Sequence, residues 1–416
     1  MPPRKAAKAA AGGIDALPDE VLHHLLSFLG AQDAVRTCVL ARRWRHLWRS
    51  ATGLRIGGGV GEMREFVDNL LLLRGRAPLD RCEFCLDDSD DSDDDTGRVN
   101  LWIRQAILCE VKVLRLQGMR CEGLPLSSQH LTRLHLYGVL LSDDYLNFSS
   151  CMALQTLDII SCSILCAKIL SQSVKYLSVT MGCFSFSFRT HVFAPSLITL
   201  RVVDYWFMTP VLEAMPSLVD ASIRVGRQTS DCCDYSEYGD CGHEDCVSCY
   251  GSIHDNNEML LLHGISEAKN LTLIAEPNTG PTFTKLKTLL LNEHWCVAPY
   301  FTALAYIFQH APVLEKLTLE LFTKGHKHEL EMKGRYFAME KSAAISKHFK
   351  IVEVRCNMVD GDVLKVLKFL CTFNICKTTA NPFHFWFNIS KIYFVPANPT
   401  KKAHMLGVRS TNLGVK

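Results

Sequence analysis

The sequence lacks any apolar run that approaches the ~18 residues of a membrane-spanning helix. Residues 1–13 carry Arg4, Lys5 and Lys8 among alanines and lack the apolar core of a secretory signal. We therefore expect residues 1–13 to form a solvated, disordered tail. We also expect the chain to work in the nucleus, the cytoplasm or both, without a membrane partner.

An excess of one charge sign is also missing, because Lys and Arg together number 45 and Asp and Glu together number 43. This balance argues against a protein that binds nucleic acid through its overall charge. The sequence shows no nucleophile elbow, phosphate loop or zincin motif. The glycines of residues 57–61 lack the Gly-Lys-Ser/Thr that would complete a phosphate loop, so we interpret them as a flexible joint. The pattern predicts a protein without an active site or a cofactor.

Cysteine, by contrast, is plentiful, with 18 residues spread over apolar segments and loops. Without a secretory signal they should stay reduced, and most, such as Cys109 and Cys371, are interpreted as small core residues. One cysteine-rich insert, residues 230–255, has ligand-like spacing that could hold tetrahedral zinc. A second C-x2-C pair at the usual distance is absent, which favours a solvated loop with incidental cysteines. The zinc alternative would use Cys241, His243, Cys246 and Cys249.

Residues 14–56 have the pattern of three short amphipathic helices. Pro18 suits a helix start, Asp19 and Glu20 suit the positive end of the helix dipole, and Gly30 suits its end. So small a helical domain is close to the lower limit of independent stability, so we expect a partner to cover part of its apolar surface. The periodic apolar residues are Val21, Leu22, Leu25, Leu26 and Leu29 in the first helix, Val35, Cys38 and Val39 in the second, and Trp44, Leu47 and Trp48 in the third.

Residues 57–110 form a predicted connecting region with a helix over Glu62–Leu73 and a strand over Leu79–Leu86. Residues 87–95 are seven aspartates and two serines. Such charge density repels itself and buries nothing apolar, so we expect a solvated loop. A calcium loop is disfavoured because a central glycine and a terminal glutamate are missing.

From residue 111 the template apolar-x-x-Leu-x-Leu repeats, beginning at positions 111, 131, 154, 174, 197 and 218. It returns less evenly at 268, 286, 314 and 349. Regular spacing in this range is the signature of a leucine-rich solenoid, in which each repeat adds one strand to a parallel sheet. We therefore predict an irregular solenoid over residues 111–376 and leave residues 377–416 unassigned.

In each predicted strand, alternate residues should point away from the core onto the concave surface. Their charges are mixed, so they do not name a class of target. The predicted outward residues are Arg115, His135, Asp158, Ser178, Arg201, Ser222, Thr272, Leu290, Thr318 and Glu353.

The segment Leu17–Trp48 resembles an F-box, in the form found in plant F-box proteins with leucine-rich repeats. The resemblance rests on Leu17-Pro18, the acidic pair, the apolar spacing and the Arg-Arg-Trp-Arg of residues 42–45. Ala41 departs from the pattern, where a serine often caps the third helix. Residues 66–108 are similar to the connecting region of the same family, and residues 349–376 resemble its C-terminal FBD module.

The resemblance implies an α/β protein with a three-helix F-box followed by the solenoid. It also implies a non-catalytic substrate receptor of an SCF-type ubiquitin ligase. The F-box would dock a Skp-family adaptor, which binds a cullin and a RING subunit, and Arg115, His135, Asp158, Ser178 and Arg201 would face the target protein. The implied adaptor-binding residues are Leu17, Pro18, Val21, Leu22, Leu25, Leu26, Leu29, Val39, Trp44 and Trp48.

Two alternatives stay open at this point. The chain could be a repeat-only protein-binding scaffold with an inert F-box, or a zinc-stabilised nucleic-acid binder. The arginines at 42, 43, 45 and 49 beside two tryptophans could suggest the latter. The F-box resemblance favours solvated arginines around a tryptophan core, so we expect no nucleic-acid partner.

Overall fold

The computed structural model describes residues 14–87, 93–121, 123, 126–229, 260–274, 282–292, 301–321, 348–356, 366, 370, 376–378, 385–387 and 391–395. The chain divides into two compact units. The first unit comprises residues up to 143 together with 150–157, and the second comprises 144–149 and the chain from 158. None of the helices within the described ranges is long and apolar enough to cross a membrane.

The first unit begins with short helical elements. Pro18 precedes α1, and Asp19 and Glu20 occupy its first turn, where the helix dipole favours negative charge. The predicted third helix is wrong, because two 3-10 turns replace it. His46 between them has φ −126° and ψ 0°, which interrupts a continuous α-helix. The elements are η1 (Ile14–Ala16), α1 (Asp19–Leu26), α2 (Ala31–Arg36), η2 (Thr37–Val39), η3 (Arg42–Arg45) and η4 (Leu47–Ser50).

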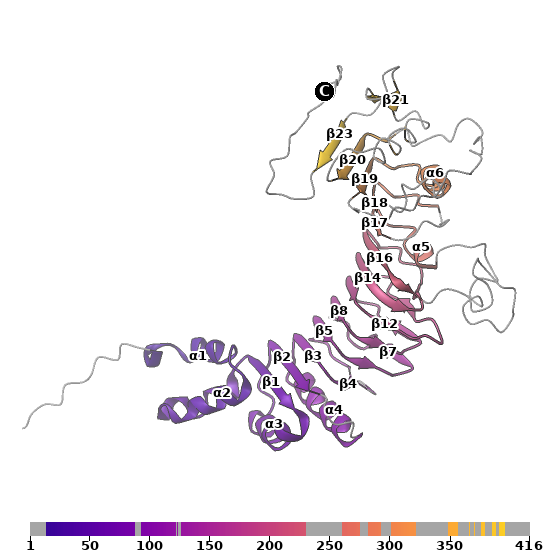
Figure 1. Ribbon diagram of the computed structural model, residues 1–416. Coiled ribbons are helices and arrows are strands. Elements are labelled where there is room, and N and C mark those ends of the chain that lie inside the picture. Colours follow the sequence, from indigo (N-terminus) through magenta and orange to yellow (C-terminus); the bar gives the residue numbers. More distant parts are fainter. Residues whose placement is uncertain are drawn as a thin grey trace, which may run out of the picture. The chain divides into compact units, whose positions relative to one another are not determined.

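Strands and two longer helices complete the first unit (Figure 1). The strands β1, β2, β3 and β5 pair in parallel, in that order. The helix α3 packs against β1 and α4. The elements are β1 (Gly53–Gly59), α3 (Val60–Arg74), β2 (Arg81–Asp87), α4 (Asp93–Leu108), β3 (Val113–Gln117), β4 (Arg120–Cys121), β5 (Arg133–Tyr137) and β6 (Leu140–Leu141).

Two predictions for this connecting region are corrected. Of the glycines predicted as a flexible joint, Gly57, Gly58 and Gly59 form the end of β1, where the neighbouring strand β2 pairs with them, and Gly61 lies in α3. Gly58 has φ +126°, a conformation that favours glycine. The predicted acidic loop is shorter than residues 87–95, since Asp87 ends β2 and α4 begins at Asp93. Aspartates suit a helix start, and residues 88–92 lie outside the described ranges.

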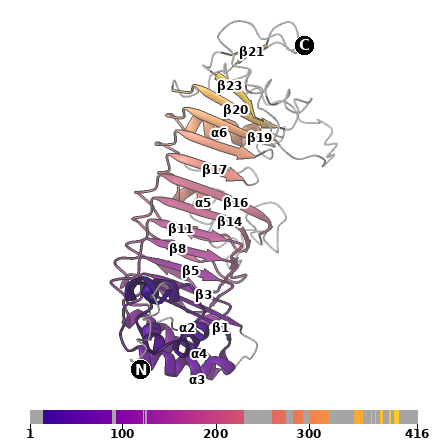
Figure 2. The ribbon, with the colours of Figure 1, turned by 90° about the vertical axis from the view of Figure 1, so that its left-hand side faces the viewer.

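The second unit is built mainly from parallel strands. Figure 2 shows β11, β14, β16, β17 and β20 one after another along the sheet. The strands β18, β19 and β23 belong to the same parallel series. A smaller sheet has the order β15-β13-β10-β7.

The bounds of the second unit's elements are as follows. They are β7 (Tyr145–Asn147), β8 (Thr156–Ile160, which begins in the first unit), β9 (Ser163–Ile164), β10 (Lys168–Leu170), β11 (Tyr176–Thr180), β12 (Cys183–Phe184), β13 (His191–Phe193), β14 (Thr199–Phe207), β15 (Val211–Leu212), β16 (Asp220–Thr229), α5 (Leu260–Gly264), β17 (Asn270–Ile274), β18 (Thr288–Asn292), α6 (Phe301–His310), β19 (Lys316–Leu321), β20 (Ile351–Cys356), β21 (Cys376–Thr378), β22 (Phe385–Phe387) and β23 (Lys391–Val395).

The repeat template predicts the core of both units. Every apolar position of the template is buried, apart from the half-buried Phe349. The series also starts earlier than predicted. Ala51, Leu54 and Ile56 around β1, and then Leu79, Cys82 and Phe84 around β2, have the same spacing and are buried. The first repeat strand therefore follows directly on the helical segment.

The unassigned tail contains structure that the sequence pattern did not indicate. The strand β23 pairs in parallel with β20, and β22 pairs with β21 in antiparallel fashion. The predicted cysteine-rich insert, residues 230–255, lies outside the described residues, and so do the four zinc-ligand candidates within it. Zinc binding there stays a prediction.

Candidate functional site

An apolar stripe lies exposed on the N-terminal helical segment. Leu22 and Leu26 of α1 are buried, whereas Val21, Leu25 and Phe28 recur at helical spacing and are exposed, Phe28 by 55%. A second exposed pair, Val39 and Leu40, follows α2, with Val39 83% exposed. Large apolar side chains that stay exposed on so small a helical domain favour contact with another protein. We call Val21, Leu25, Phe28, Leu29, Val39 and Leu40 the apolar stripe.

Arg43 ties the arginine-rich turn to the start of α1. Its guanidinium donates hydrogen bonds to the Asp19 carboxylate, at 2.9 Å from Nε, and to the Leu17 carbonyl oxygen, at 2.6 Å from Nη2. Charge-assisted bonds of this kind are stronger than neutral ones. These bonds give a structural reason why Asp19, at the start of the segment, accompanies Arg43 near its end.

The two tryptophans and Arg74 anchor this segment to the first repeat. Trp44 and Trp48 are buried. Arg74, at the end of α3, is also buried and donates to the carbonyl oxygens of Trp48 at 3.2 Å and Ala51 at 2.8 Å. Burial lowers the pKa of the Arg74 guanidinium, which nevertheless stays charged because its ordinary value is so high. The end of the helical segment is therefore fixed to α3 through its backbone carbonyl groups.

A close backbone approach joins α1 to β1. A Cβ at Gly53 would lie 2.7 Å from Ser27 Cβ and 2.9 Å from the Ser27 carbonyl oxygen, so only glycine fits without a shift. Nearby, Arg55 donates to the Phe28 carbonyl oxygen at 3.2 Å. The end of α1 and the first repeat strand are thus held together.

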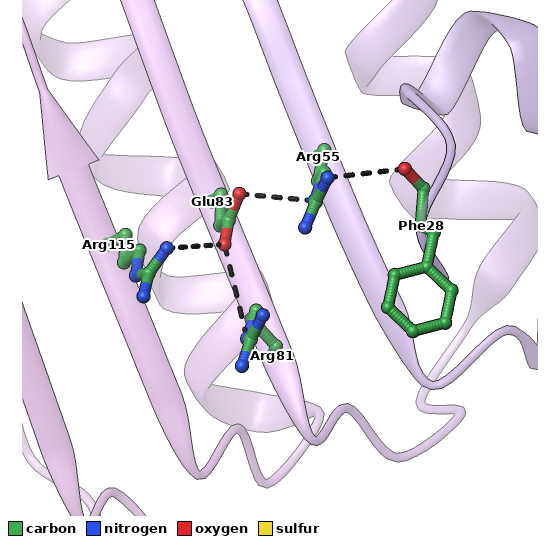
Figure 3. A network of polar contacts seen from close by, with 5 residues as sticks. All are labelled: Phe28, Arg55, Arg81, Glu83 and Arg115. Atoms are coloured by element: carbon green, nitrogen blue, oxygen red, sulfur yellow. Dashed lines mark hydrogen bonds and ion pairs between the residues drawn. The ribbon is translucent and has the colours of Figure 1, made fainter. Parts of the chain in front are cut away.

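Arg55 also takes part in a polar network on the outward face of the strands (Figure 3). We call outward the face of β1, β2, β3 and β5 that carries the alternate, non-core residues. The Glu83 carboxylate is nearly buried and receives Arg55 Nε at 3.2 Å and Arg115 Nη1 at 3.2 Å. Arg81 Nε lies farther away, at 3.9 Å. One carboxylate therefore holds two guanidinium groups in place and lies near a third.

The predicted outward residues lie in register along the paired strands. In the first unit Arg115 pairs with His135, and in the second unit the row runs from Ser178 through Arg201 to Glu353. Two predictions of exposure are wrong, since Thr318 is 5% and Glu353 8% exposed. Neighbouring side chains cover Glu353, and Lys316 and Arg355 contact its carboxylate at 2.5 Å and 2.7 Å.

The described residues offer little that could perform chemistry. No group of three His, Cys, Asp or Glu within the described ranges is arranged to hold a metal. Burial raises the pKa of the Cys82 and Cys109 thiols. A thiol with a raised pKa is a poor nucleophile at neutral pH.

Comparison with known proteins matches residues 14–53 to the F-box domain. The meiotic F-box protein MOF of Oryza sativa subsp. japonica is 29% identical over 359 residues, which cover 73% of this chain and 70% of that protein. A putative F-box/FBD/LRR-repeat protein of Arabidopsis thaliana is 29% identical over 30% of this chain and 29% of its own length. A putative F-box protein of Arabidopsis thaliana is 32% identical over 23% of this chain and 26% of its own length.

The chain therefore carries an F-box domain and is similar to F-box and F-box/leucine-rich-repeat proteins of plants. The match covers less than two thirds of either Arabidopsis relative. The F-box match ends at residue 53, where β1 begins, so the F-box and the first repeat strand share a boundary.

The structure divides the residues that the F-box resemblance implied for adaptor binding. Pro18, Val21, Leu25, Leu29 and Val39 are exposed, and Leu17 is half-buried. The other residues implied for contact are corrected, because they are buried in the F-box core and would hold the fold. They are Leu22, Leu26, Trp44 and Trp48.

Two exposed apolar residues of the F-box were missed, Phe28 and Leu40. Phe28 lies seven positions after Val21 and three after Leu25, so the helical period could have found it. Leu40 lies just beyond η2, where helical spacing no longer applies, and the sequence carried no signal for its exposure.

Proposed function

We propose that this chain is the substrate-recognition subunit of an SCF-type ubiquitin ligase, with a Skp-family adaptor docked on the F-box and a cullin and a RING subunit joined through it. The F-box domain and the similarity to F-box and F-box/leucine-rich-repeat proteins of plants support this role. In such an assembly the chain acts as a non-catalytic adaptor, and its place of work would be the nucleus, the cytoplasm or both.

The apolar stripe carries the adaptor part of the proposal. Its six residues come from α1, the turn after it, and the end of η2, and the F-box leaves all of them exposed. Large apolar residues that stay exposed on a small helical domain favour a partner that buries them. Burial of a side chain of this size contributes roughly 1.5–3 kcal/mol when it is complete.

The target part of the proposal rests on the repeat strands. Their core residues are buried, so the alternate residues are the ones that a target could contact. Repeat proteins use such extended faces for binding. The proposed target-facing residues are Arg115, His135, Asp158, Ser178 and Arg201.

A pull-down with a purified Skp-family adaptor tests the adaptor part. Changing Val21 and Leu25 together to Glu places two charges in the apolar stripe without touching the core. We expect adaptor capture to fall about tenfold or more, since charge in an apolar contact is costly. Changing Leu72 and Leu101 together to Glu is the matched control, because both are exposed on other helices of the same unit.

The control should capture the adaptor as well as the native chain does. Equal capture by the Val21/Leu25 variant would refute the proposed docking face. A native chain that captures no adaptor would leave the repeat-only scaffold as the better account.

A further inference from the structure

The outward face of β1, β2, β3 and β5 is unusually rich in arginine. It carries Arg55, Arg81, Arg115 and Arg133, and the acidic residues at the outward positions of these strands are Glu83 and Asp87, the last residue of β2. The four cationic residues therefore exceed the two anionic ones. The chain as a whole is close to neutral, with a formal charge of +2, so this excess is local. We call the four arginines with Glu83 the arginine face.

The geometry leaves much of this positive charge available to a ligand. Arg115 contacts Glu83 through one terminal nitrogen, and its side chain stays 48% exposed. Arg81 lies 3.9 Å from the carboxylate, beyond hydrogen-bond distance. Arg133 has no ion-pair partner among the described residues, and it is exposed. Glu83 thus orients guanidinium groups without neutralising them.

The spacing of these groups suits carboxylates on a polypeptide. Neighbouring strands lie about 4.8 Å apart, and alternate residues of one strand lie about 6.6 Å apart. The planar guanidinium fork matches a carboxylate in a bidentate arrangement. Fixing the forks in advance through Glu83 lowers the entropic cost of binding.

A single-stranded nucleic acid fits this face less well. Such ligands bind through stacking on several aromatic side chains along a basic groove. Tyr137 is the single aromatic residue among the outward positions of these four strands, all of which the structure describes.

We propose that the arginine face binds an acidic polypeptide segment, rich in aspartate and glutamate, of the target protein. This inference rests on the proposed function, since it names the chemistry of the target that the receptor would hold. The outward residues as a whole have mixed charges, and the inference assigns target binding to the arginine face among them. This face follows the F-box directly in the chain.

Binding of two labelled peptides by the full chain tests the proposal, with fluorescence anisotropy as the readout. One peptide is rich in Asp and Glu, and the other carries Asn and Gln in their place. We expect the native chain to bind the acidic peptide about tenfold or more tightly than the neutral one, and the difference to shrink at high salt. Changing Arg115 and Arg133 together to Gln should remove the preference for the acidic peptide.

Changing Arg76 and Arg104 together to Gln is the matched control. It removes the same charge from exposed positions of the first unit that lie outside the four strands, and it should leave acidic-peptide binding within about twofold of native. Equal binding of the two peptides, full binding by the Arg115/Arg133 variant, or tighter binding of an oligonucleotide of equal charge would each overturn the proposal. Adaptor capture, measured on the same variants, reports on the F-box separately, so failure of the proposed function is distinguishable.

Discussion

The outward faces of the two units are built on the same strand geometry and the same apolar core, yet their chemistry differs. In the first unit arginines dominate, whereas in the second Ser178 precedes Arg201 in the central row, and Ser222 and Thr272 follow it on the way to Glu353. The buried core positions determine the structure of each repeat. The outward positions between them can carry different residues without disturbing that structure. Function should therefore be sought in the outward residues.

Two nearly buried glutamates, one in each unit, differ in the charges that surround them. Glu83 faces three arginines, so its cluster has an excess of positive charge. Glu353 faces Lys316 and Arg355, and Arg355 also contacts Glu320 at 2.8 Å, so that cluster is balanced. The first arrangement is suited to an anionic ligand, and the second to holding neighbouring strands together.

The largest effects should come from the shared core and should be alike in both units. Leu134→Ala in the first unit and Leu271→Ala in the second each remove a fully buried side chain. Each should lower the free energy of unfolding by about 2–5 kcal/mol, because a cavity remains. Chemical denaturation measures this, with Arg133→Ala as the exposed neighbour control, expected within about 0.5 kcal/mol of native. A much smaller loss at one leucine would show that the two cores are not equivalent.

The glutamates should differ in their contribution to stability. Glu83→Gln leaves three arginines close together without an anion and should cost about 1–2 kcal/mol, since the arginines are partly exposed and screened. Glu353→Gln leaves one acidic partner, Glu320, within its cluster and should cost about half as much. Thermal denaturation at low and high salt distinguishes them, because salt should rescue the Glu83 variant more. The reverse order would contradict the charge comparison.

The balanced cluster should also give a pH signature. Burial alone would raise the pKa of Glu353, but hydrogen bonds from Lys316 and Arg355 outweigh it and leave that pKa below its ordinary value. Its contribution is therefore present above the ordinary glutamate pKa and is lost as pH falls through the lowered folded-state value. The stability difference between the native chain and Glu353→Gln should shrink as pH drops below about 4.5. A difference that grows on acidification would rule out this sign.

The smallest expected effect is a gain in the stability of the F-box, without a change at the outward face of either unit. Ala41 precedes η3 and makes no side-chain capping bond. Ala41→Ser supplies a hydroxyl that can cap the turn, worth about 0.5–1 kcal/mol. The melting temperature should rise slightly, and acidic-peptide binding should not change. A drop in melting temperature would mean that the serine hydroxyl finds no backbone N–H there.

Much of the fold could be predicted because burial repeats along the sequence. The pairs Leu134/Leu136 and Leu271/Leu273, for example, show directly that every second residue of a repeat strand is buried. The repeat strand β1 could not be recognised, because its last residues are glycines, which suggest a loop unless a neighbouring strand is known to pair with them. The same limit applies to β23, whose pairing with β20 joins segments that are distant in the chain.

The candidate site was predictable in its residue types and less so in its exposure. Helical spacing located Val21 and Leu25 on one face, and the F-box resemblance favoured a tryptophan core, as the burial of Trp44 and Trp48 confirms. The two 3-10 turns that carry these tryptophans could not be predicted from the spacing. Likewise, the outward position of Glu83 went unnoticed because β2 was not assigned to the repeats. Its cluster is formed by residues from three strands.

Hydrogen exchange of the full chain, with and without the purified Skp-family adaptor, tests the proposed division of labour most directly. The account predicts slower exchange over residues 18–40, where the apolar stripe lies, and unchanged exchange over the repeat strands β3, β5, β11 and β14. Protection that falls on those strands while residues 18–40 stay unchanged would contradict it, because the adaptor would then occupy the surface assigned to the target.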